Sequence, residues 1–270
     1  MYESHWELTS RPFAGTGDAR TYYPAEAQQA ALLKLRYALE SRAGAAVLAG
    51  GSGLSKTLVA QTLLRSLPER FQPRTHIVFP ELPPDAFLAY LAAELCGPTG
   101  GGTVDADLRR LEHTLRTGAE QGRHAVVAID EAHLLRESRV LQSLRLLTNI
   151  EHQGEATITF LLVAQPPLLT ALERFPELDE RLGAKCLLRR FTADETCAYL
   201  QHRLAAAGAK RTIFDDAALS AIFDASHGVP RRINRIADLA LLIGYAEDLR
   251  QIGRETIETV TAELTTVAAE

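Results

Sequence analysis

The chain has 270 residues, 46% of them hydrophobic and 23% charged, and its formal net charge is −5. A chain of this length buries a large core, and its acidic balance gives no overall electrostatic attraction for nucleic acid. Because no stretch approaches the ~18 apolar residues of a membrane helix and the N-terminus lacks a secretory signal, we expect a cytoplasmic protein without a membrane segment.

The first predicted element is a helix over residues 24–42. Leu32, Leu35 and Leu39 recur on one helical face, and Gly44 ends the pattern. From residue 45 to residue 190, short apolar runs alternate with helical patterns, which is typical of a sheet built from strand, crossover helix and strand. We expect strands over 45–50, 75–80, 125–129, 157–165 and 185–191, and helices over 57–67, 84–97, 105–122 and 138–150, with a connector at 97–103.

Beyond residue 191 the strand patterns stop and helical patterns follow one another. These cover residues 193–208, 215–228, 231–248 and 254–264. A change of element type favours a domain boundary. We therefore expect an α/β nucleotide-binding domain over residues 1–191, opened by an N-terminal segment and helix over 1–43, and a smaller all-helical domain over 192–270.

Cysteines and basic clusters indicate no further site. Cys96, Cys186 and Cys197 are odd in number and lack C-x-x-C spacing, which argues against a disulfide framework and a zinc site and predicts buried thiols. Basic residues gather at 187–191 and 230–236. Such clusters are usually solvated faces or internal anion contacts, so DNA remains a possible partner that the net charge does not support.

Residues 50–57 read GGSGLSKT, one residue away from the phosphate-binding pattern G-x-x-x-x-G-K-[ST]. Ser55 stands where the last glycine belongs. In such loops, backbone N–H groups and a helix N-terminus hold phosphates, lysine adds a positive charge, and the hydroxyl of Thr57 would hold Mg²⁺. Taken alone, the loop is also compatible with an ordinary turn between a strand and a helix. The expected nucleotide contacts are Gly50, Gly51, Ser52, Gly53, Leu54, Ser55, Lys56, Thr57 and Leu58.

An acidic pair follows the apolar run 125–129 and decides between these alternatives. An ATP hydrolase needs one carboxylate near Mg²⁺ and a second that polarises water. Asp130 suits the first role and Glu131 the second. The two motifs together favour a phosphate-binding loop, with ATP or ADP and Mg²⁺ as cofactors.

These motifs resemble those of AAA+ ATPases of the general secretion pathway protein A type, and the chain is similar to ATPase subunits of some transposition systems. The likeness covers nearly the whole sequence, including the segment 6–44, VVAIDEAHLL at 126–135, FLLVAQPPL at 160–168 and HGVPRRINRIADLALLIGYAED at 227–248. It implies a P-loop NTPase (AAA+) fold, in which a parallel five-stranded sheet flanked by helices precedes a helical lid. It also implies an ATP-dependent homo-oligomer and an unidentified protein partner.

The resemblance implies roles for several further residues. Gln165 resembles the sensor-1 residue that orients water, and Arg231 in GVPRR resembles the sensor-2 arginine that contacts phosphate from the lid. Arg181 resembles an arginine finger, which binds phosphate oxygens in a neighbouring subunit. Arg174 is an alternative finger, and a surface salt bridge is an alternative role for Arg181. His133 is interpreted as structural, since a histidine after this motif has no obligatory chemistry.

Ser55 and the extent of the chain depart from the family pattern. If residue 55 must adopt φ/ψ values that are sparsely open to residues other than glycine, serine costs about 1 to 3 kcal/mol, whereas helical dihedrals cost little. The chain lacks the membrane span and cell-wall-binding region of long secretion members, so we expect no secretion role from the fold alone. Adenine contacts are expected near Tyr22 and Tyr23 and in the lid. Three functions stay open: an ATP hydrolase, a nucleotide-gated scaffold with little turnover, and a DNA-associated transposition-type ATPase.

Overall fold

The computed structural model describes residues 1–15, 22–98, 102–135 and 139–266. The chain divides into two compact units. The helical unit comprises Met1–Glu26, Gly53–Leu58 and Arg189–Glu270, and the sheet unit comprises Ala27–Ser52 and Val59–Leu188. This division differs from a single boundary at residue 191, because both the N-terminal segment and part of the glycine-rich loop group with the later helices.

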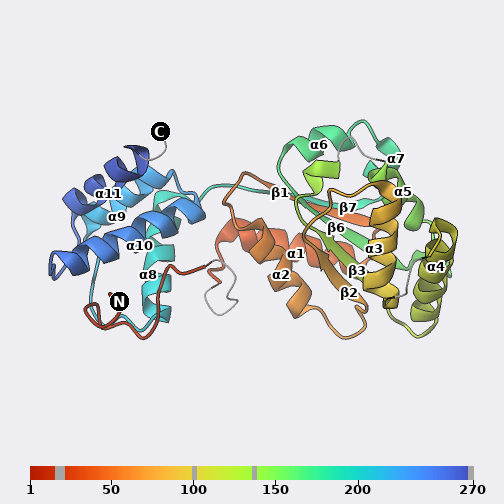
Figure 1. Cartoon of the computed structure of the whole chain (residues 1–270), viewed down its shortest axis with the longest axis horizontal. Coiled ribbons are helices and arrows are strands. Elements are labelled where there is room, and N and C mark those ends of the chain that lie inside the picture. The colour runs from red at the N-terminus through yellow and green to blue at the C-terminus, as the bar shows by residue number, and fades with distance from the viewer. Residues whose placement is uncertain (16–21, 99–101, 136–138, 267–270) are drawn as a thin grey trace. The chain divides into compact units, whose positions relative to one another are not determined.

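The sheet unit contains the predicted five-stranded parallel sheet flanked by helices, in the order β2-β3-β6-β1-β7 (Figure 1). Strands β1, β3 and β6 are buried along their entire lengths, as their continuous apolar sequences predict. The strands are β1 (Ala45–Gly50), β2 (Arg74–Ile77), β3 (Ala125–Ile129), β6 (Ile158–Ala164) and β7 (Leu182–Leu188). The predicted fold class is confirmed.

Helices on the sheet bury leucine, alanine and phenylalanine side chains in one continuous core with the central strands. They are α3 (Pro84–Cys96), α4 (Val104–Glu120), α5 (Val140–Leu147), α6 (Pro167–Leu172) and α7 (Pro176–Asp179), with the 3₁₀ turn η2 (Ala132–Leu135). Two further helices, α1 (Glu26–Glu40) and α2 (Lys56–Ser66), bury leucine and alanine side chains that are not part of this core. The predicted helices at 57–67, 84–97, 105–122 and 138–150 correspond to α2, α3, α4 and α5. The predicted connector 97–103 lies partly outside the described residues.

The two edge strands differ from their predicted bounds. β2 ends at Ile77. The apolar residues Val78 and Phe79, which were expected to continue the strand, are 63% and 64% exposed. β7 begins at Leu182, three residues before the predicted start. A Cβ at Gly183 would lie 2.5 Å from the Ala43 Cβ, so glycine permits the close approach that lets the strand begin there.

Two short strands and two short helices of the sheet unit were not predicted. The strands β4 (Glu151–His152) and β5 (Glu155–Ala156) form a hairpin whose two turn residues, Gln153 and Gly154, have φ of 53° and 82°. Positive φ at both central residues is the type I′ arrangement that suits a hairpin, so the H-Q-G-E sequence carried a usable signal. Helices α6 and α7 each have proline at the first turn, another signal that sequence reasoning passed over.

The helical unit contains α8 (Ala193–Ala206), α9 (Asp216–Ser226), α10 (Pro230–Ala246) and α11 (Arg254–Thr266), which match the four predicted helices. Thr192 and Glu195 form a capping box at the start of α8, and Asp215 caps α9. α9 ends at Ser226, and its C-cap residue His227 has the left-handed φ of 51° that closes many helices. Local capping thus explains where α8 and α9 begin and where α9 ends.

The N-terminal segment completes the core of the helical unit (Figure 1). Trp6 is fully buried, and its Nε1 donates a hydrogen bond to the Leu241 carbonyl of α10 at 2.9 Å. A Cβ at Gly244 would lie 2.6 Å from the Trp6 ring, so glycine makes room for it. Arg203 of α8, only 2% exposed, donates from Nε to the Pro12 carbonyl at 2.6 Å. These contacts attach the segment to two helices of this unit.

The structure can be compared with three expectations from the sequence, which concern a membrane helix, the cysteines and a metal site. Among the residues described, no helix is long and apolar enough to cross a bilayer. The cysteines are free thiols, but only Cys186 is buried, so the expectation of burial is wrong for the half-buried Cys96 and Cys197. Within the described ranges, no group of three or more histidine, cysteine or acidic side chains is arranged to hold a metal ion.

Candidate functional site

The carboxyl ends of three adjacent strands carry most of the predicted site residues of the sheet unit. β6 lies between β3 and β1, and the parallel register pairs Ala164 with Ala49 and Leu162 with Ile129. Gly50 at the end of β1, Asp130 after β3 and Gln165 after β6 therefore share one edge of the sheet. In open α/β sheets this edge is where ligands bind.

The glycine-rich loop leads from β1 into α2, and its residues 53–58 group with the helical unit. Ser55, the residue immediately before α2, has φ +62°. The alternative of helical dihedrals at this position is therefore wrong, and serine occupies a conformation that favours glycine. Lys56 and Thr57 are the first two residues of α2, where helix N–H groups suit an anion.

Gly53 brings this loop against the start of α10 within the helical unit. Its φ is +79°, and an added Cβ would lie 2.9 Å from Val229 Cγ1 and 3.1 Å from Arg231 Cβ. The Arg231 N–H also donates a hydrogen bond to the Gly53 carbonyl at 3.3 Å. The structure thus joins Arg231 to the loop, in an arrangement that a side chain at position 53 would disrupt.

Asp130 and Glu131 each face a histidine. Asp130 is 4% exposed, and its Oδ2 lies 3.5 Å from Nε2 of His76 on β2. Glu131 has φ +49°, and its carboxylate, 48% exposed, lies 3.4 Å from Nδ1 of His133. The two acids therefore have different environments: one is buried in the sheet unit, and the other is accessible to solvent.

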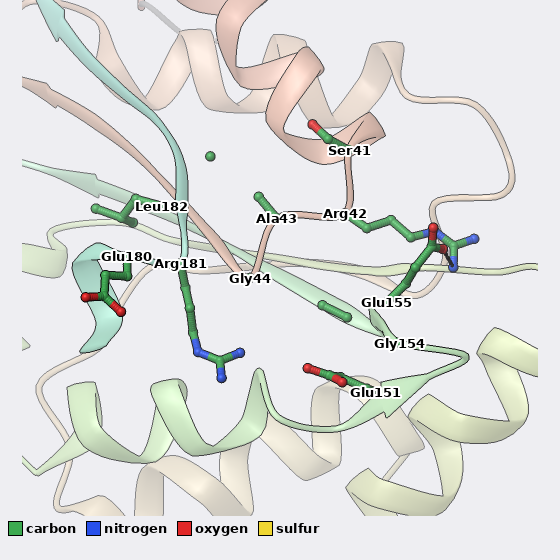
Figure 2. A pocket seen from close by; sticks show the side chains of 12 residues that line it. Ser41, Arg42, Ala43, Gly44, Glu151, Gly154, Glu155, Glu180, Arg181 and Leu182 are labelled. Carbon is green, nitrogen blue, oxygen red and sulfur yellow. Dashed lines mark ion pairs between the residues drawn. The ribbon is translucent and has the colours of Figure 1, made fainter. Parts of the chain in front are cut away.

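Arg181 lies at the amino-terminal ends of the strands, whereas Asp130 and Gln165 lie at the carboxyl ends. It precedes β7, and its carbonyl accepts a hydrogen bond from Ala45 at the start of β1 at 3.1 Å. Its guanidinium donates to the Thr148 carbonyl at 3.3 Å and points into an open cavity of about 350 Å³ that Glu151 also lines (Figure 2). Arg181 is therefore separated from the other predicted site residues of the sheet unit, which lie at the carboxyl ends of the strands.

Of the expected adenine contacts, Tyr22 has a buried hydroxyl with no hydrogen-bond partner among the described residues. Burial raises the pKa of Tyr22 to about 12, so the hydroxyl stays protonated and able to donate. Tyr23 instead packs its ring against Phe191, Tyr199 and His202 inside the helical unit. Tyr22 is thus the better placed of the two for a hydrogen bond to a ligand.

Residues 39–172 match the AAA domain family. The chain belongs to the AAA ATPase family. General secretion pathway protein A of Aeromonas hydrophila is 31% identical to this AAA protein over 277 residues. That alignment covers 100% of this chain and 50% of the relative, so the chain spans half the length of the relative it matches.

Solved structures show the same AAA+ fold. The Aeropyrum pernix ORC2 protein, in its ADPNP-ADP complexes, has a TM-score of 0.71 at 18% identity, covering 94% of this chain and 71% of that one. Cdc6p of Pyrobaculum aerophilum has a TM-score of 0.73 at 18% identity, covering 93% and 70%. Drosophila ORC bound to DNA has a TM-score of 0.70 at 14% identity, covering 98% and 66%.

Sequence reasoning missed two residues that matter to this AAA+ site. His76 faces Asp130, and a histidine on the strand beside the acidic pair would have been the signal. Gly228 lies three residues before Arg231; its φ is +68°, and an added Cβ would lie 2.0 Å from the Phe191 carbonyl oxygen. The glycine in HGVPR was a signal for such a close approach.

Proposed function

We propose that this AAA+ chain binds ATP with Mg²⁺ and hydrolyses it. The observation that carries the proposal is the shared sheet edge: the phosphate loop leaves β1 there, and Asp130 and Glu131 leave β3 two strands away. The phosphates would be held by Gly53, Lys56 and Thr57. The metal ion would be held by Thr57 and Asp130. When bound, Mg²⁺ neutralises charge on the phosphate oxygens.

The residues of the chain then have distinct tasks. Glu131, at 48% exposure, is accessible to a water molecule and would accept its proton, while the buried Asp130 stays with the metal. Gln165 would orient that water from the end of β6. Arg231 would reach the phosphates from α10, since its backbone already contacts the loop at Gly53. Phosphate release by the purified chain, supported by Mg²⁺ and abolished by EDTA, tests this function directly.

We also propose that the chain works as a homo-oligomer in which Arg181 acts on the nucleotide of a neighbouring subunit. Its place at the opposite sheet edge supports action in trans rather than within its own subunit. Ring size and protein partner are open, and DNA binding, which the net charge does not favour, stays a prediction.

Replacing Arg181 with alanine should lower ATP turnover by about a thousandfold, because an arginine finger stabilises charge in the transition state. The exposed Arg174 is the matched control, and Arg174→Ala should retain activity within about twofold. The decisive measurement mixes Arg181→Ala with an inactive Glu131→Gln chain. If Arg181 acts in trans, the mixture recovers phosphate release that neither variant shows alone; a mixture without activity contradicts the assignment.

A second candidate function is a nucleotide-gated scaffold that assembles with ATP but turns it over little. The left-handed backbone of Ser55 favours it, since strain in the loop weakens the conformation that holds phosphate. Size-exclusion chromatography with ATP and Mg²⁺, read beside phosphate release, separates the two functions. Assembly without turnover supports the scaffold, and assembly with turnover supports the hydrolase.

Ser55→Gly should bind ATP about tenfold more tightly than the wild type. Relieving a left-handed non-glycine residue is worth about 1 to 2 kcal/mol, and ~1.4 kcal/mol corresponds to a factor of ten. Ser55→Ala is the matched control: it keeps the Cβ and the strain, so its affinity should stay near that of the wild type. Calorimetric titration measures both, and equal affinities for Ser55→Gly and wild type would remove the strain explanation.

A further inference from the structure

The backbone of Glu131 is fixed by its neighbours, whereas its side chain is not. Its φ is +49°, its N–H donates to Asp130 Oδ1 at 2.9 Å, and its carbonyl accepts from the Leu134 N–H at 2.9 Å. These bonds close the turn that leads from β3 into η2. The carboxylate itself, 48% exposed, stands at the end of a flexible side chain. A residue acting as a base needs its carboxylate directed as well as its backbone.

His133 is placed to direct that carboxylate. It lies in η2 between Ala132 and Leu135, at 0% and 1% exposure, so the turn is anchored in the core on both sides. The imidazole is 17% exposed, and Nδ1 lies 3.4 Å from Glu131 Oε2. This nitrogen is buried and has no hydrogen-bond partner in the described part of the chain. A shift of about 0.5 Å would bring it to the usual N–H···O distance of about 2.9 Å.

A second histidine, His76, faces Asp130, the acid next to Glu131. His76, level with Ala128 in the β2–β3 register, faces Asp130 with Nε2 3.5 Å from Oδ2. Asp130 is buried and further held by its backbone N–H, which donates to the Ile77 carbonyl at 2.8 Å. The sheet therefore positions Asp130 without His133, and the Nδ1 edge of His133 faces Glu131.

We propose that His133 is a positioning residue for Glu131. An Nδ1–H donates to Glu131 Oε2 and restricts the carboxylate to one direction, leaving its other oxygen to accept a proton. The inference rests on the proposed ATP hydrolysis, in which Glu131 is the base. It goes beyond the interpretation of His133 as a purely structural residue, because a structural histidine needs no contact with the carboxylate.

The contact itself can be tested without nucleotide, by NMR of the full chain labelled with ¹⁵N-histidine. The His133 signals are assigned by their loss in His133→Asn. We expect the wild-type ring to carry its proton on Nδ1, and Glu131→Ala to shift the His133 ring nitrogens. Glu120→Ala, at an exposed position ending α4, is the control and should leave them unchanged. Identical His133 shifts in wild type and Glu131→Ala would overturn the proposal.

Steady-state kinetics test the consequence for hydrolysis. His133→Ala should lower kcat about tenfold, the worth of one hydrogen bond to a charged group, while KM stays within about twofold. His133→Asn restores an N–H near the position of Nδ1 and should recover most of kcat, whereas His133→Gln should not. His113→Ala, at an exposed site on α4, is the matched control.

The outcomes separate this inference from the proposed function. No Mg²⁺-dependent turnover in the wild type overturns the hydrolase, while the NMR comparison still decides whether His133 holds Glu131. Turnover in the wild type with an unchanged kcat in His133→Ala overturns the positioning role alone. A fall in kcat that asparagine rescues and glutamine does not supports both.

Discussion

Replacing Glu131 with glutamine should leave ATP binding intact and lower phosphate release by at least about a hundredfold. Glutamine has nearly the same shape but cannot accept a proton, and a positioned general base contributes about 10²- to 10⁴-fold to rate. Asp130, which is buried and faces His76, remains unchanged in this variant, so metal and nucleotide affinity should be retained. Calorimetric titration with ATP and Mg²⁺ measures binding, and a phosphate-release assay measures turnover.

The matched control for this prediction is Glu120→Gln, an exposed carboxylate at the end of α4. It removes the same charge from the sheet unit far from the acidic pair, and its turnover should equal that of the wild type. Wild-type turnover in Glu131→Gln would assign the base to another residue. Loss of ATP binding in the same variant would instead show that Glu131 belongs to the binding residues.

Gly228→Ala should destabilise the helical unit by roughly 3 to 5 kcal/mol, combining left-handed strain with overpacking against a rigid neighbour. The added Cβ would lie 2.0 Å from the Phe191 carbonyl oxygen. The backbone there is held in place, because the Phe191 N–H donates a hydrogen bond to the Gly228 carbonyl at 2.9 Å. Because Val229 and Arg231 follow directly and contact Gly53, the variant should also weaken nucleotide binding.

Trp6 offers a specific measurement of this effect, because it is the single tryptophan and is fully buried in the helical unit. Its fluorescence during urea unfolding should show a lower midpoint for Gly228→Ala. The matched control is Gly208→Ala in the same unit, where φ is +89° but the added Cβ would meet only the Thr9 side chain, at 3.1 Å. That variant should lose about 1 kcal/mol, the strain term alone. Equal midpoints for Gly228→Ala and Gly208→Ala would contradict a dominant backbone clash.

The sheet and much of its functional edge could be predicted from the sequence because their signals are local. Strands β1, β3 and β6 are continuous apolar runs, and parallel pairing brings the residues that follow them to one edge. Asp130 and Gln165 could therefore be predicted to lie there from their places in the chain. The helices of the second unit were equally predictable, since caps such as Thr192 and Asp215 mark their starts.

What the sequence could not predict depends on contacts between distant residues. The placement of Trp6 follows from a pocket that α10 provides, and no periodic pattern in the first residues indicates it. His76 meets Asp130 through strand register, and Gly228 is required by a carbonyl that lies near it only in the folded state. The dihedral of Ser55 was open for the same reason: the loop conformation, not the residue type, determines it.

The attachment of the first residues to α10 has a consequence for synthesis of the chain. Trp6 is synthesised 235 residues before Leu241, whose carbonyl accepts its hydrogen bond. The sheet unit, whose segments lie between these two residues, can be complete while the N-terminal aromatic residues still lack their partners. Contacts of such long sequence separation form slowly and leave apolar surface exposed meanwhile. Buried aromatic side chains of this segment, such as Trp6, therefore acquire their partners only after the sheet unit has been synthesised.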